Sequence, residues 1–117
     1  MSQVSDPTPK FSLNVDVQPD ATRVYCTGRL MRESGDVLRT EVKKLIAPGK
    51  RIIIDLTKVT HSDSSGLSAI ISIYISCKSA GCRLELINLG EKIRQLLTIA
   101  NLLSLFEKAG DGSFRIP

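Results

Sequence analysis

The stretch RIIIDLTKVTHSDSSGLSAI, residues 51–70, decides the fold of this chain. It begins with three consecutive isoleucines, Ile52–Ile54, and such an uninterrupted β-branched run is typical of a strand covered on both faces. We place that strand at Arg51–Leu56. A polar cluster follows, and from Leu67 onward apolar residues recur at helical spacing. The stretch therefore predicts a buried strand whose carboxyl end leads through a polar tip into a helix.

The segment before this strand predicts an antiparallel hairpin. Residues 1–10 contain two prolines and no periodic pattern, which indicates a flexible lead-in. Apolar and polar residues alternate over 11–17, and a second strand follows over 22–28, where Gly28 ends it. The expected apolar face of the first strand consists of Phe11, Leu13, Val15 and Val17.

A helix is predicted between this hairpin and the isoleucine-rich strand. Ser34 or Asp36 can cap its start, because their side-chain oxygens accept hydrogen bonds from free backbone N–H groups. Pro48 and Gly49 stop it. Its apolar residues recur at helical spacing and are Leu38, Val42, Leu45 and Ile46.

Four further elements are predicted after the polar tip. An amphipathic helix covers 66–81 and is closed by Gly81, and a strand follows over 82–88. A second helix covers 90–100, and a short final strand lies around 104–108. The apolar stripe expected on the first of these helices is Leu67, Ile70, Ile71, Tyr74 and Ile75.

The predicted order of elements defines an α/β fold. Two strands come first, and helices and strands then alternate along the chain. Successive β-α-β units imply parallel strands joined by right-handed crossovers, whereas the first hairpin adds antiparallel pairing at one side. We therefore expect a mixed β-sheet with helices packed on it.

Composition indicates one globular domain with an ordinary core. The chain has 117 residues, of which 42% are hydrophobic and 24% charged. It contains no run of about 18 apolar residues, so no membrane span is expected. The net charge of +4 permits nucleic-acid binding, but aromatic residues for base stacking make up only 4% of the chain. The basic residues that come nearest to a cluster are Arg39, Lys43, Lys44, Lys50 and Arg51, and we interpret them as a solvated helix face.

The cysteines favour a reducing compartment. Cys26, Cys77 and Cys82 are odd in number and follow no secretory signal. Neither a histidine nor a further cysteine pair near Cys77 and Cys82 completes a zinc site. We expect a cytoplasmic protein with buried, reduced thiols and no metal.

The polar tip contains the residue types of a serine hydrolase. His61, Asp63 and Ser64 are close neighbours in the chain, so their side chains diverge rather than converge on one point. The G-x-S-x-G pattern of a nucleophile elbow is also missing, and His61 is the only histidine. We therefore do not expect an enzyme.

Two other interpretations of the tip remain open from the residues alone. Asp63 or Ser64 can cap the following helix, and Gly66 lets another chain or a ligand approach the backbone closely. Alternatively, a serine at this helix start is a substrate, because the free N–H groups and the helix dipole favour a phosphate there. A docking partner would then meet added charge and bulk.

These residues resemble the signature of the STAS domain, the fold of bacterial anti-sigma factor antagonists. The family pattern is an apolar strand ending in Asp-Leu, a short link, and Asp-Ser-Ser/Thr-Gly-Leu opening a long helix. Here the pattern is met by Ile52–Leu56 and Asp63–Leu67. VYCTGRL at 24–30 and GCRLELINLGEKIRQLLTIANLLSLFE at 81–107 are also similar to the family. The likeness implies a single STAS-like domain over 11–117.

The resemblance implies a phosphorylation-switched regulator of transcription. Such proteins bind a serine-kinase anti-sigma factor and so free a sigma factor. The kinase phosphorylates the serine directly after the motif Asp, which abolishes binding, and a PP2C-type phosphatase reverses this. By position the phospho-acceptor is Ser64, and no cofactor, metal or direct nucleic-acid contact is implied. The implied partner-binding residues are Ser62, Asp63, Ser65, Gly66 and Leu67.

The family pattern also occurs in STAS proteins with other roles. These are stressosome scaffolds and accessory subunits of lipid-transport ATPases, which would give a non-switched structural subunit. Many antagonists carry an acidic residue after the early Gly-x-Leu, whereas Met31 and Arg32 follow Leu30 here. The resemblance is compatible with a homodimer.

Overall fold

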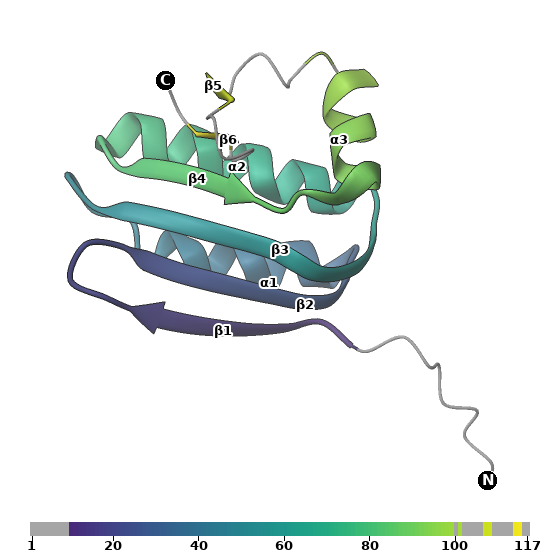
Figure 1. The fold of residues 1–117 in the computed structure, drawn as a ribbon, viewed down its shortest axis with the longest axis horizontal. Helices are drawn as coiled ribbons and strands as arrows, with labels where there is room; N and C mark the ends of the chain where they lie inside the picture. The colour runs from purple at the N-terminus through teal and green to yellow at the C-terminus, as the bar shows by residue number, and fades with distance from the viewer. Residues whose placement is uncertain (1–9, 100, 102–106, 109–113, 116–117) are drawn as a thin grey trace, which may run out of the picture.

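The computed structural model describes residues 10–99, 101, 107–108 and 114–115 (Figure 1). The predicted lead-in, apart from Lys10, lies outside these residues. The elements in chain order are β1 (Ser12–Val17), β2 (Thr22–Leu30), α1 (Glu33–Lys43), β3 (Arg51–Ser62), α2 (Ser64–Ala80), β4 (Arg83–Ile87), α3 (Gly90–Ile99), β5 (Glu107–Lys108) and β6 (Phe114–Arg115).

The strands form one mixed sheet in the order β1-β2-β3-β4-β6-β5. β1 and β2 are antiparallel, whereas β2, β3 and β4 run parallel to one another. The predicted hairpin followed by parallel β-α-β units is therefore confirmed. β6 pairs antiparallel with both β4 and β5 and was not predicted. The final strand expected at 104–108 corresponds to β5, and residues 104–106 lie outside the described part.

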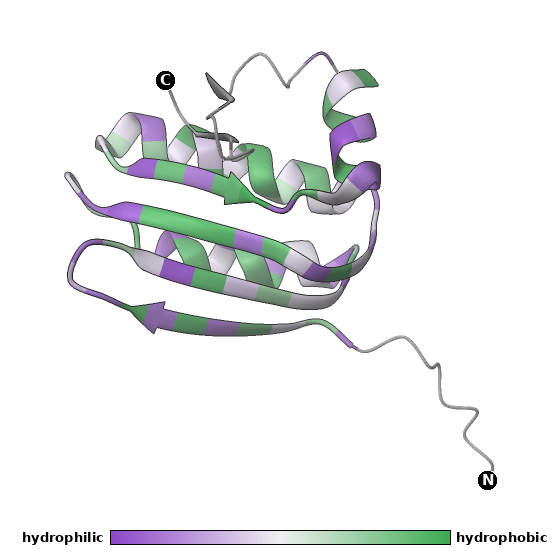
Figure 2. Ribbon diagram, viewed as in Figure 1, coloured by the Kyte–Doolittle hydropathy of each residue, from purple (hydrophilic) through white to green (hydrophobic). Residues whose placement is uncertain are grey.

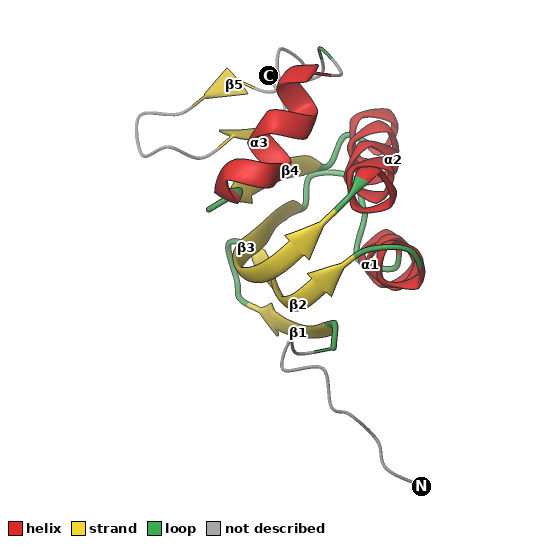
Figure 3. Cartoon of the chain, turned by 90° about the vertical axis from the view of Figure 1, so that its right-hand side faces the viewer, coloured by secondary structure: helices red, strands yellow, loops and turns green. Residues whose placement is uncertain are grey.

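The helices α1 and α2 lie side by side on one face of the sheet (Figure 3), and α3 contacts β3 and α2. Alternate residues of β3 point into the helix-covered core, where Ile52, Ile54 and Leu56 are almost completely buried. Ile53 on the opposite face is only 6% exposed. The isoleucine-rich strand is thus buried on both faces, as predicted, and Figure 2 shows an unbroken apolar stretch within its first half, between two hydrophilic positions.

Within the described part of the chain, none of the helices is long and apolar enough to cross a membrane. The three cysteines are free and buried, as the sequence predicted. Burial, with a smaller contribution from the charge of Asp55, raises the pKa of Cys26 to about 12. Such a thiol stays protonated at neutral pH and behaves as a small apolar core residue.

The face that α2 buries agrees only in part with the predicted stripe, of which Ile70 and Tyr74 are buried. Ile75 is 58% exposed, and Leu67 and Ile71 are only half-buried. The prediction was wrong for Ile75, and it omitted buried residues, namely Ile73 and the small Gly66, Ala69 and Cys77. Small residues allow α2 to approach the sheet and α1 closely, so they define the buried side. The buried residues of α2 are Gly66, Ala69, Ile70, Ile73, Tyr74 and Cys77.

The apolar face predicted for the first strand is correct for Phe11 and Leu13, which pack against the core, but wrong for its other two residues, and the predicted caps of α1 are also wrong. Val15 and Val17 are 40% and 71% exposed, because the two helices do not extend over the outer strand β1. Neither Ser34 nor Asp36 caps α1. Its N-cap is Arg32, which provides no side-chain hydrogen bond, and Asp36 instead forms an ion pair with Arg39.

Both central strands extend beyond their predicted ends. β2 continues past Gly28, which adopts a positive φ of 95° beside an irregularity in the pairing, to Leu30. β3 does not end at Leu56 but continues to Ser62. At one point two β3 residues, Leu56 and Thr57, lie opposite Cys26 alone, and a second irregularity follows. These bulges accompany the curve of β3 near its carboxyl end in Figure 1.

Asp55 stabilises the first bulge. Its carboxylate accepts hydrogen bonds from the backbone N–H of Thr57, at 2.9 Å, and from the Thr57 hydroxyl. Asn88 at the end of β4 donates in turn to the Thr57 hydroxyl over 2.6 Å. Burial by itself would raise the pKa of Asp55. The hydrogen bonds from Thr57 and Asn88 and the charge of Arg23 outweigh burial, so the pKa lies below its ordinary value of 3.8.

Asp55 should therefore make the stability of the fold depend on pH. A carboxylate with a depressed folded-state pKa stabilises the protein above its unfolded pKa, and this contribution is lost as the pH falls through the folded value. We expect the free energy of unfolding to fall below about pH 4 in wild type and to fall less steeply in Asp55→Asn. Urea denaturation across this pH range measures the slope. Asp20→Asn, in the exposed β1–β2 turn, is the matched control, and an equal slope in wild type and Asp55→Asn would contradict the assignment.

The start of α2 is packed unusually close to its neighbours. A methyl group added at Gly66 would lie 2.5 Å from the carbonyl oxygen of Leu30, at the end of β2. One added at Gly35 of α1 would lie 2.9 Å from the carbonyl oxygen of Ser65. Both distances are under 3.0 Å, a separation that real β-carbons essentially never show. The two glycines therefore allow β2, α1 and α2 to meet at one point.

Gly66→Ala should destabilise the protein. Overpacking against backbone costs about 1–3 kcal/mol, whereas the gain in helix propensity is about 1 kcal/mol at most. We expect a net decrease in the free energy of unfolding, measured by urea denaturation. Ser68→Ala on the exposed side of the same helix is the control and should change stability by less than about 0.5 kcal/mol. Equal stability of the two variants would show that the contact can relax.

Candidate functional site

The polar tip lies where β3 ends and α2 begins. Ser62, the last residue of β3, is 8% exposed and pairs with Leu30 across the parallel ladder. Asp63 is the N-cap of α2, and Ser64 is the first helical residue. The tip is thus held on two sides, by the end of β2 and by the start of α1. Its backbone position follows from these contacts with β2 and α1.

Asp63 caps the helix. Its Oδ1 accepts hydrogen bonds from the backbone N–H groups of Ser65 and Gly66, at 2.9 and 3.3 Å. The Asp63 carbonyl also accepts the first helical bond, from Leu67 at 3.1 Å. Of the two caps that the sequence left open, the structure selects Asp63. This leaves the Ser64 hydroxyl outside the capping arrangement.

The predicted site residues differ in accessibility. Ser64 is exposed, whereas Asp63, Ser65 and Leu67 are half-buried. Ser62 and Gly66 are buried, so they shape the tip but present little side-chain surface. From Leu67 a shallow groove continues along α2, with a volume of about 450 Å³, and Lys43 of α1 contributes to its wall. Ser64 therefore offers the most accessible hydroxyl in the Asp-Ser-Ser-Gly motif.

The tip does not assemble a hydrolase triad. The ring of His61 is exposed, and its Nδ1 lies 3.1 Å from the hydroxyl of Thr60. The Asp63 carboxylate is engaged by helix N–H groups rather than by an imidazole. A triad requires the histidine to lie between the acid and the nucleophile. Among the described residues, no hydrogen bond joins His61 to Asp63 or Ser64.

Three of the five basic residues singled out from the sequence are paired with carboxylates. Arg39 forms an ion pair with Asp36 on α1. Lys44, which caps the end of α1, forms one with Glu41, and in each pair the two residues are three positions apart. Arg51 pairs instead with Glu85 on β4. The pairs Arg39–Asp36 and Lys44–Glu41, each three residues apart, are typical of a solvated helix face, which is how the sequence was interpreted.

A different set of basic residues adjoins the tip and was missed by the sequence analysis. Arg29 pairs with His61 in the β2–β3 ladder, and Arg32 lies in the connection between β2 and α1. Together with Lys10 they line a groove of about 650 Å³. Their spacing in the sequence gives no signal, because the hairpin is what brings Lys10 to the end of β2. Had β2 been predicted to continue to Leu30, Arg29 would have been placed at the end of this strand, next to the tip.

The sequence profile of the STAS domain matches residues 12–112, and the chain belongs to this family. The anti-sigma-B factor antagonist of Bacillus subtilis (strain 168) is 30% identical over 99 residues, which cover 83% of this chain and 91% of that protein. The predicted family is therefore confirmed.

Solved structures agree with this fold. An anti-sigma factor antagonist from Mycobacterium paratuberculosis superimposes with a TM-score of 0.66 at 18% identity, covering 86% of each chain. The Bacillus cell fate determinant SpoIIAA in its phosphorylated form gives a TM-score of 0.62 at 21% identity, covering 80% of this chain and 85% of that one. At these identities the likeness concerns the fold alone.

The cap makes a prediction about stability. Asp63→Ala removes the acceptor for two helix N–H groups and should lower the free energy of unfolding by about 1 kcal/mol. Asp63→Asn keeps an oxygen at this position and should lose much less. Chemical denaturation of both variants measures the difference. Ser64→Ala is the neighbouring control, and a loss there as large as in Asp63→Ala would place part of the cap on Ser64.

Proposed function

We propose that this protein is an anti-sigma factor antagonist whose binding is switched off by phosphorylation of Ser64. The observation that carries the proposal is the exposed Ser64 hydroxyl at the start of α2, beside a cap that Asp63 alone supplies. The relative at 30% identity, an anti-sigma-B factor antagonist, supports the same role. The protein acts by binding in the cytoplasm and is not an enzyme.

The partner is a serine-kinase anti-sigma factor, which docks on the tip and so releases its sigma factor. Ser64, Ser65 and Leu67 supply the accessible part of the docking surface. Asp63 orients this surface through the cap, and the buried Ser62 and Gly66 fix its shape. A PP2C-type phosphatase removes the phosphate and restores binding.

Phosphorylation changes the surface without changing the fold. A phosphoserine carries about −1.5 to −2 charges at neutral pH, and a helix start favours this charge through its dipole. The Asp63 hydrogen bonds do not involve the Ser64 hydroxyl, so they persist. The partner, which must contact the tip directly, meets both the added bulk and the negative charge. The modification is therefore read by the partner.

Two variants of Ser64, with Ser65→Ala as their control, test the switch against the cognate anti-sigma kinase. Ser64→Ala should remain unmodified after incubation with the kinase and ATP, yet bind the kinase as wild type does. Ser64→Asp should bind at least about tenfold more weakly, because a charge at the contact disfavours docking. Mass spectrometry reads the modification, and calorimetric titration reads the binding.

Ser65→Ala is the matched control and should still gain a phosphate. Modification of Ser64→Ala but not of Ser65→Ala would move the acceptor to Ser65. Stable co-purification with an ATPase or a large assembly, unchanged by Ser64→Asp, would instead favour the scaffold or transporter-subunit role and contradict the switch.

A further inference from the structure

A basic groove lies beside the tip that carries Ser64. We define it by its cationic residues Lys10, Arg29 and Arg32 and its apolar residues Phe11, Met31 and Val37. Phe11 and Met31 are half-buried, and Val37 is 47% exposed. Glu33 is the acidic residue in the wall. The groove thus combines a net positive charge with an apolar floor.

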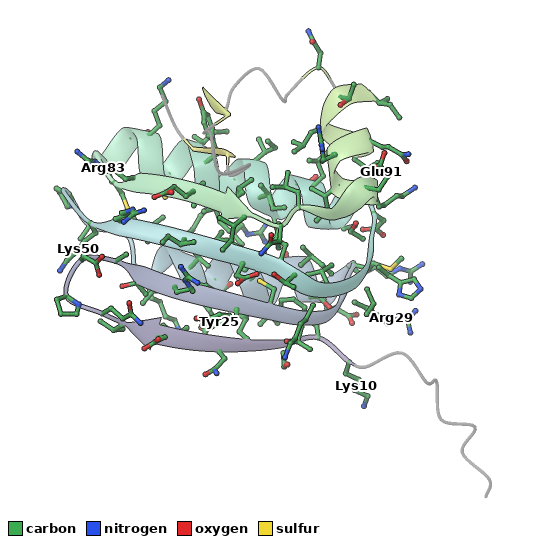
Figure 4. The ribbon with its side chains drawn as sticks, viewed as in Figure 1. Lys10, Tyr25, Arg29, Lys50, Arg83 and Glu91 are labelled. Carbon is green, nitrogen blue, oxygen red and sulfur yellow. The ribbon has the colours of Figure 1, made fainter. Side chains whose placement is uncertain are left out.

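The basic groove and Ser64 occupy one edge of the molecule. Arg29 and Leu30 pair with His61 and Ser62 at the ends of β2 and β3. The Leu30 carbonyl lies against Gly66, only two residues after Ser64. Figure 4 shows Lys10 and Arg29 at the same end of the sheet, opposite Lys50 and Arg83. A protein that docks on Ser64 would therefore lie beside the groove.

The charges of the basic groove are held at the surface. Lys10, Arg29 and Arg32 are exposed. Within the described ranges, neither Lys10 nor Arg32 has a carboxylate in salt-bridge range, whereas Arg39, Lys44 and Arg51 do. Arg32 lies in the tight connection from β2 to α1, where its backbone adopts a positive φ of 51°. Positive charge is therefore concentrated where the partner docks.

We infer that the basic groove binds an acidic segment of the anti-sigma factor, with an apolar side chain of that segment seated on Phe11, Met31 and Val37. The inference rests on the proposed function and adds the chemistry of the partner. Complementary charge supports this occupant, because opposite potentials across an interface speed association and exclude wrong partners. The groove would then select the cognate kinase, while Ser64 controls whether it stays bound.

Charge reversal tests the inference by calorimetric titration with the cognate anti-sigma factor. The variant Lys10→Glu/Arg32→Glu should bind about tenfold or more weakly than wild type, because it sets like charges against each other. Its affinity should also fall less with added salt, since the attraction that salt screens has been removed. Lys50→Glu/Arg83→Glu is the matched control. It changes the net charge by the same amount at the opposite end of the sheet, where both residues are exposed.

The outcomes separate the inference from the proposed function. If wild type does not bind the anti-sigma factor, the proposed function fails and the inference falls with it. If wild type binds, and Lys10→Glu/Arg32→Glu binds equally well or no worse than the control, only the inference fails. The inference would also be overturned if wild type bound a DNA duplex in preference to the anti-sigma factor and Lys10→Glu/Arg32→Glu lost this DNA binding. Lys10→Gln/Arg32→Gln, which is neutral, should give an intermediate affinity and guards against misfolding of the reversed variant.

Discussion

The contact between Gly66 and the Leu30 carbonyl is the constraint on which the rest of this structure depends. It sets the start of α2 directly against the end of β2, and Gly35 brings α1 against the same turn. Each contact is between backbone atoms or positions without a side chain. The tip is therefore positioned by the main chain, and its serine side chains are not needed to hold it. That separation allows a hydroxyl to be exposed without weakening the fold.

The same packing determines which charges surround the tip. Because β2 extends to Leu30 and α1 begins almost at once, Arg29 and Arg32 are placed on either side of a buried residue. The hairpin then adds Lys10 from the start of β1. The edge that carries Ser64 thus gains its positive charge from the tight connection between β2 and α1. Electrostatics and packing at this edge have a common origin.

Much of this architecture could be read from the sequence, and the exceptions have physical causes. The run Ile52–Ile54 and the Gly81 cap identified β3 and the end of α2, because burial and left-handed φ leave clear residue signatures. The bulges of β3 have no such signature in the sequence, because they depend on how β3 pairs with β2. The buried face of α2 was predicted only in part: Ile70 and Tyr74 were identified, whereas small residues such as Gly66 carry no hydrophobic signal. Asp63 and Ser64 were placed correctly at the tip, whereas the basic groove depends on tertiary contacts between distant segments.

The Asp63 cap has a consequence for the timing of the proposed regulation. The cap does not involve the Ser64 hydroxyl, so under the proposed function no refolding step would separate the two states. The rate of switching would then be set by the modifying enzymes and by dissociation of the partner. Both forms would then resist proteolysis equally well, so the proposed modification would change the active fraction and not the amount of the protein.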